Sequence, residues 1–127
     1  FDLAMIAITP GGWYDWNDKS ILDGSPKMTE LRPLLDQARE KGLGLVGMKA
    51  GRYLAGRARL GWGNPTAFDD FYDKELLQAK LSEFQKSYAF VLEHGLDVVN
   101  ADMQNMLHLK ENFIAAATSS QYFSATA

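Results

Sequence analysis

Residues 96–112 read LDVVNADMQNMLHLKEN, a strand-length apolar run that passes through a polar turn into apolar residues at helical spacing. Asn105 is one of the residue types that accept a backbone N–H at a helix N-terminus, so we expect the helix to begin there. The stretch therefore predicts a strand over 96–101 that is followed at once by a helix.

Two similar units precede this one. The nearly continuous apolar runs 3–8 and 43–48 are of strand length. Helical spacing follows each run, from the capping residue Thr29 to Gly42 and from about residue 73 to residue 95. The chain thus predicts three strand-helix units.

Strands that alternate with helices predict an α/β fold in which right-handed crossovers build a parallel sheet. The pattern leaves open a doubly wound sheet and part of a (β/α)8, or TIM, barrel. A complete barrel needs ~250 residues, whereas the chain has 127. Phe1 also opens directly into an apolar run, so we expect residues 1–127 to be one partial barrel domain from a longer polypeptide.

The composition narrows the classes of function. A net charge of −3 and a pI near 5.3 disfavour a nucleic-acid-binding surface and favour small molecules or proteins as partners. The lack of cysteine excludes disulfides and thiolate chemistry within these residues. The sequence has neither a membrane-spanning run nor a signal peptide, so we expect no membrane partner and a cytoplasmic location.

The loop after the second predicted strand is strongly basic. Between residues 42 and 68 there is no acid, although the chain as a whole is acidic. The cations of this loop are Lys49, Arg52, Arg57 and Arg59. Arginines beside flexible glycines can bind phosphate oxygens bidentately, which favours a phosphate or pyrophosphate site. The alternative is a solvated loop whose charges pair with acids elsewhere.

Lys49 has a second interpretation. A lysine directly after a barrel strand can be partly desolvated and can then act as a Schiff-base nucleophile. The competing interpretation is a lysine that reaches solvent or a carboxylate.

Three aromatic residues follow the first predicted strand. Trp13, Tyr14 and Trp16 lie in a predicted glycine-led loop, where exposed rings can stack on a sugar, a nicotinamide or another flat substrate. They can equally form a small core that holds a long loop in place.

The two histidines have ordinary explanations. His94 is expected at a helix C-terminus, where the helix dipole favours a partly protonated imidazole. His108 falls in the first turn of the last helix, where it can contact a bound anion or simply lie on the surface.

Residues 96–112 resemble the last strand and the cofactor-binding helix of the aldo/keto reductases, which are (β/α)8 barrels that transfer hydride from NADPH or NADH to a carbonyl. The run KGLGLVGMK at 41–49 is similar to the seventh strand of bacterial members, and 1–12 resembles the sixth. The resemblance implies that the chain is strands six to eight of the barrel with their helices, and that the N-terminal half is absent.

The resemblance also implies a cofactor site. Glu111 and Asn112 match the family's pair that holds the adenine. The turn 101–105 reads ADMQN, where members commonly carry Pro-Gly-Met-Arg-Asn or Pro-Lys-Ser, and an aspartate there would repel a 2′-phosphate. Both NADP and NAD therefore stay open as cofactors. The implied cofactor-binding residues are Met48, Lys49, Arg52, Asp102, Met103, Gln104, His108, Glu111 and Asn112.

The family's catalytic aspartate, tyrosine, lysine and histidine lie in the first half of the barrel, so no catalytic residue is assigned here. The resemblance implies an NAD(P)H-dependent oxidoreductase in the longer parent, with a small-molecule carbonyl substrate at Trp13, Tyr14 and Trp16 and no activity in this chain alone. Two alternatives stay open. One is a non-enzymatic carbohydrate- or partner-binding α/β module that uses the aromatic residues, and the other is a Schiff-base lyase that uses Lys49.

Overall fold

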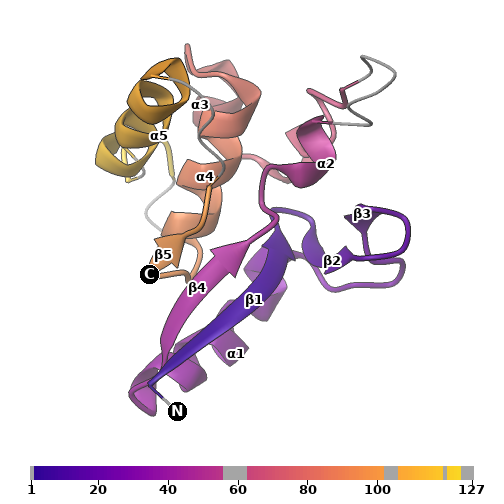
Figure 1. The fold of residues 1–127 in the computed structure, drawn as a ribbon, viewed down its shortest axis with the longest axis vertical. Helices are drawn as coiled ribbons and strands as arrows, with labels where there is room; N and C mark the ends of the chain where they lie inside the picture. Colours follow the sequence, from indigo (N-terminus) through magenta and orange to yellow (C-terminus); the bar gives the residue numbers. More distant parts are fainter. Residues whose placement is uncertain (1, 56–62, 102–105, 119, 124–127) are drawn as a thin grey trace.

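The computed structural model describes residues 2–55, 63–101, 106–118 and 120–123. These residues form an α/β fold in which a mixed sheet is combined with helices (Figure 1). The strands are β1 (Leu3–Thr9), β2 (Gly12–Asp15), β3 (Ser20–Ile21), β4 (Gly44–Met48) and β5 (Val98–Val99). The helices are α1 (Met28–Glu40), α2 (Arg52–Ala55), α3 (Lys74–Gln78), α4 (Glu83–Glu93) and α5 (Met106–Thr118), and a 3-10 turn spans Asp69–Phe71.

The three strands that the sequence predicts are parallel neighbours. The sheet order is β3-β2-β1-β4-β5, and β4 lies between β1 and β5. Leu3 pairs with Gly44 and Ala7 with Met48, while Val46 pairs with Val98. The expected α/β class and the parallel centre of the sheet are therefore confirmed, and the sheet of the described residues is open.

The sequence predicts a glycine-led loop after β1. This prediction is wrong, because these residues form a β-hairpin. Thr9 pairs with Gly12, so β2 returns antiparallel to β1, and β3 then pairs with β2. The Thr9 hydroxyl donates to the Gly12 carbonyl at 3.0 Å. Gly12 has a φ of 121°, a backbone conformation that residues with a side chain rarely adopt. The aromatic residues that follow Gly12 have a high β-strand propensity.

The prediction of a single helix over 73–95 is also wrong, because two separate helices, α3 and α4, form there. Ser82 caps α4: its hydroxyl accepts the Gln85 N–H at 3.2 Å, and the Gln85 side chain accepts the Ser82 N–H at 2.7 Å. This reciprocal pair satisfies two donors that a helix start leaves free. In α3 the buried residue is Leu76, whereas Leu77 of the expected stripe is exposed.

Other boundaries move by a few residues. Helix α1 begins at Met28, before the expected cap Thr29, because the Lys27 N–H is held by the Glu30 carboxylate at 2.8 Å. The strand expected over 96–101 shortens to β5. Asn105, the expected cap of the last helix, lies outside the described residues.

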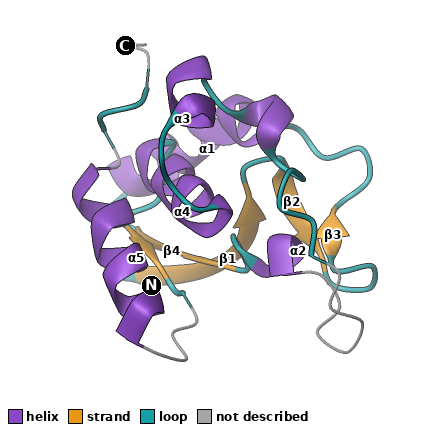
Figure 2. Cartoon of the chain, turned by 90° about the horizontal axis from the view of Figure 1, so that it is seen from above, coloured by secondary structure: helices purple, strands orange, loops and turns teal. Residues whose placement is uncertain are grey.

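One face of the parallel strands carries the core. Helices α1 and α4 lie on the same side of β1 and β4 (Figure 2), and Ile8 and Leu45 are buried beneath them. On the opposite face Met5, Val46 and Val98 share one row of the register, yet Met5 is 59% and Val98 53% exposed. Apolar residues on both faces are typical of parallel sheets that are covered on both sides.

The described helices are short for a membrane. None of them is long and apolar enough to cross one.

His94 is half-buried at the C-terminal end of α4. Its ring lies 4.1 Å from the Phe90 ring and 5.3 Å from the Phe123 ring between centroids, and Nε2 has no hydrogen-bond partner among the described residues. Burial lowers the pKa of His94, while the Asp73 carboxylate raises this pKa and the Arg32 guanidinium lowers it further. Burial thus shifts the pKa of His94 in the direction opposite to the one expected from the helix dipole.

We expect His94 to lower the free energy of unfolding as the pH falls below about 6.5. The pKa of His94 in the folded chain lies below the ordinary value of 6.5, so the unfolded chain takes up the proton at a higher pH than the folded chain does. Protonation therefore favours the unfolded chain. Urea unfolding between pH 7.5 and 5 should show this loss for the native chain, and the variant His94→Phe should lose less stability over the same range. His108→Gln is the matched control. An equal pH dependence in native and His94→Phe chains would contradict the assignment.

Candidate functional site

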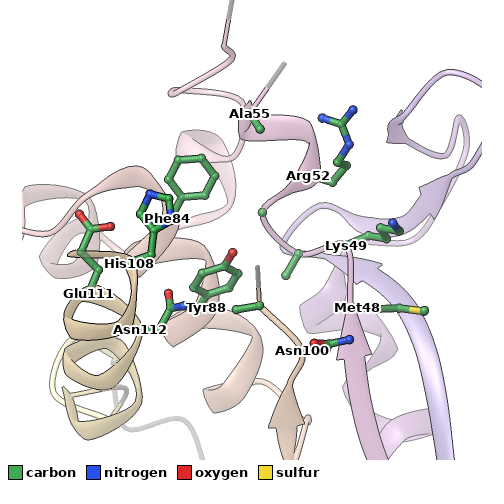
Figure 3. A pocket seen from close by; sticks show the side chains of 13 residues that line it. Met48, Lys49, Arg52, Ala55, Phe84, Tyr88, Asn100, His108, Glu111 and Asn112 are labelled. Atoms are coloured by element: carbon green, nitrogen blue, oxygen red, sulfur yellow. The ribbon is translucent and has the colours of Figure 1, made fainter. Parts of the chain in front are cut away.

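A pocket of about 780 Å³ opens beyond the C-terminal ends of β4 and β5, between α2, α4 and α5 (Figure 3). Ligands of parallel α/β folds collect at this end of the strands. The lining residues are Met48, Lys49, Ala50, Gly51, Arg52, Ala55, Phe84, Tyr88, Asn100, Ala101, His108, Glu111 and Asn112.

The pocket brings together most of the predicted cofactor residues. Those that line it are Met48, Lys49, Arg52, His108, Glu111 and Asn112. Asp102, Met103 and Gln104 lie outside the described residues, as do Arg57 and Arg59 of the basic loop. Two segments that are far apart in the sequence, the β4–α2 connection and α5, therefore face one cavity.

Helix α4 holds the β4–α2 connection in place. The Ser87 hydroxyl donates to the Ala50 carbonyl at 2.8 Å, and both residues are buried. Gly51 then passes so close to α4 that an added Cβ would lie 2.7 Å from the Tyr88 hydroxyl and 3.0 Å from the Phe84 ring. The absence of a side chain at this residue lets the pocket wall and α4 meet.

Helix α5 forms the opposite wall. The Gln85 side chain of α4 donates to the Glu111 carbonyl at 3.2 Å, which fixes α5 against α4. His108, Glu111 and Asn112 are half-buried on the pocket side of α5 (Figure 3). The Asn112 Nδ2 atom is buried and has no hydrogen-bond partner among the described residues. A buried donor without a partner is costly, and Asn112 is also one of the residues that line the pocket.

The β4–α2 side of the pocket is positively charged. Lys49 and Arg52 are half-buried there, and Lys49 has a φ of 70°, an unfavourable backbone conformation for a residue with a side chain. Burial raises the pKa of the Tyr14 hydroxyl, and the Arg52 guanidinium opposes this rise. Two cations near one strand end can bind an anion.

The three aromatic residues divide into two roles. Trp13 packs against the core and Tyr14 is buried, whereas Trp16 is 59% exposed. The Trp16 ring meets Tyr14 edge-on with centroids 5.4 Å apart, and the Lys49 Nζ atom lies 5.2 Å from the Trp16 centroid. Trp16 thus has the most exposed ring of the three, and Trp13 is half-buried.

Sequence reasoning missed part of the pocket. Phe84 and Tyr88 line it from α4, although their spacing marks them as members of an apolar helical stripe. Asn100 also lines it, and its position near a strand end was the available signal. Gly51, one of the flexible glycines of the predicted phosphate-binding loop, lines it as well. Within the described ranges, no group of three or more His, Asp or Glu residues could hold a metal ion.

Comparisons of the chain with models of protein families, with curated proteins and with solved structures find no match. A functional proposal therefore depends on two observations. They are the geometry of the pocket and the resemblance of residues 41–49 and 96–112 to segments of the aldo/keto reductases.

We expect Gly51→Ala to destabilise the fold by about 1–3 kcal/mol, because the new methyl group overlaps the Tyr88 hydroxyl and the Phe84 ring. Chemical unfolding measures this change. The double variant Gly51→Ala with Tyr88→Phe should recover part of the loss, because it removes the overlapping hydroxyl, and a double-mutant cycle separates this coupling from the cost of Tyr88→Phe alone. Full stability in Gly51→Ala would show that the two walls do not meet as described.

Proposed function

We propose that this chain supplies part of the NAD(P)H site of a carbonyl-reducing oxidoreductase of the aldo/keto reductase type. The observation that carries the proposal is the meeting of two segments in one pocket. Met48, Lys49 and Arg52 come from the end of β4, and Glu111 and Asn112 come from α5. The resemblance implies that these segments bind opposite ends of a dinucleotide.

Each wall suits one part of that cofactor. Asn112 and Glu111 both line the pocket. The Asn112 amide, once turned toward a ligand, can donate to a ring nitrogen of adenine, and the Glu111 carboxylate can accept from its amino group. Arg52 can bind the pyrophosphate oxygens, while Lys49 lies on the same wall. The bound cofactor would supply the hydride, while the residues of this chain bind and orient it.

The fold proposed for the parent is a TIM barrel in which β1, β4 and β5 are strands six to eight. The exposed apolar face of Met5, Val46 and Val98 supports this, since the inner face of a barrel is filled by such side chains. β1 pairs with β2 only at Ile8 and Thr9, which leaves the rest of that edge for another strand. In this proposal the missing N-terminal half is the partner that brings the catalytic residues, and this chain alone has no reductase activity.

The lyase alternative is weaker than the reductase proposal. The Lys49 Nζ atom packs 5.2 Å from the centroid of the Trp16 ring, a contact that a Schiff-base nucleophile would have to give up in order to attack a carbonyl. The carbohydrate-binding alternative rests on the exposed ring of Trp16. Both NADP and NAD remain proposed cofactors, and the cytoplasm, where both are available, remains the proposed compartment.

We expect Asn112→Leu to weaken NADPH and NADH binding by about 10-fold, because the variant loses one hydrogen-bond donor to the ligand. Its melting temperature should stay the same or rise, since an unpartnered buried polar group is replaced by an apolar group of similar size. Isothermal titration calorimetry and thermal unfolding on the same samples measure both effects. Asn17→Leu, in the exposed turn between β2 and β3, is the matched control.

Two results would contradict the proposal. The native chain could fail to bind either dinucleotide while it binds simple sugars, which would favour the carbohydrate-binding module. Alternatively, Asn112→Leu could leave dinucleotide affinity unchanged, which would place the cofactor elsewhere.

A further inference from the structure

We propose that Lys49 and Trp16 bind the carboxylate and the ring of a planar acid, so that the substrates of the proposed reductase are aromatic or similarly flat keto acids. The substrate role rests on the proposed function. The binding site itself depends only on the two side chains and on their surroundings.

The backbone aims Lys49 at this site. Lys49 directly follows β4 and lies in the left-handed region, with a φ of 70°, and such a conformation persists where the surrounding structure requires it. In Figure 3 its side chain extends away from the side chains of α5. Its ammonium thereby reaches the Trp16 ring, 5.2 Å from the centroid.

The Lys49 ammonium carries an uncompensated charge within the part of the chain that the structure describes. No carboxylate there forms an ion pair with it, although the chain has 16 acids and 13 lysines and arginines. Asp15, beside Trp16 in sequence, accepts the backbone N–H groups of Asn17 and Asp18 at 2.7 Å and 3.2 Å. A contact with a ring leaves the N–H donors of an ammonium able to bind an anion.

Trp16 supplies a firm apolar surface beside that charge. Its ring is 59% exposed, and it is supported by the edge-on contact with Tyr14, which is itself buried. An exposed indole held in one orientation suits a planar group, because stacking then costs little side-chain entropy. The ammonium and the indole together match a ligand whose carboxylate is attached to a flat ring.

The matched probes are 4-acetylbenzoate and its methyl ester, which share the ring and the ketone and differ in the charge. We expect the native chain to bind the acid at least ~10-fold more tightly than the ester, as for a charge-assisted hydrogen bond. Binding of each is measured by NMR titration, in which the Trp16 indole N–H signal should shift. The preference should also weaken as salt is added.

Three variants test the roles of the residues. Lys49→Met should remove the preference for the acid, and Lys49→Arg, which keeps the charge, should retain most of it. Trp16→Ala should weaken the binding of the acid and the binding of the ester to a similar extent. Lys41→Met, which removes an exposed lysine next to α1, is the control and should bind as the native chain does. The Lys49→Arg comparison keeps the test valid if Lys49→Met fails to fold.

Equal binding of acid and ester by the native chain would overturn the inference, as would an unchanged preference in Lys49→Met. The outcome is separate from that of the proposed function. A chain that binds NADPH without preferring the acid loses only this inference. A chain that prefers the acid but binds neither dinucleotide keeps the carboxylate site and loses the reductase assignment.

Discussion

The parallel pairing of β1 with β4 is the constraint on which the rest of the structure depends. Because Ala7 pairs with Met48, the two strands end at the same edge of the sheet. The β2 hairpin after β1 and the connection after β4 therefore begin side by side, which brings Trp16 to Lys49. The same pairing buries Ile8 and Leu45 on one face and leaves the other face apolar and open.

Much of the fold could be predicted from local patterns, and the failures have local causes. Apolar runs of strand length correctly predicted β1 and β4, because buried parallel strands are apolar on both faces. The break between α3 and α4 was missed because periodicity alone continues through Ser82, although Ser82 and Gln85 carry the spacing of a capping box. The hairpin at Thr9 was missed because proline and glycines mark a turn without indicating whether the next segment is a strand or a loop.

The candidate site was predictable only in part. The resemblance identified pocket residues on two distant segments, among them Arg52 and Asn112. It did not show that Gly51 must lack a side chain, because that requirement comes from the Tyr88 and Phe84 side chains of another helix. Nor could spacing separate buried Tyr14 from exposed Trp16, because β2 ends at Asp15 and Trp16 lies in the turn that follows it.

The bond from Gln85 to the Glu111 carbonyl has a thermodynamic consequence for the pocket. One wall belongs to α5, which is fixed by its packing on α4, and the other wall belongs to the β4–α2 connection. A ligand that contacts both walls binds only when α5 is docked, so its binding free energy adds to the stability of that docking. Linkage is reciprocal, and any change that loosens α5 from α4 lowers the affinity for such a ligand without touching a residue that binds it.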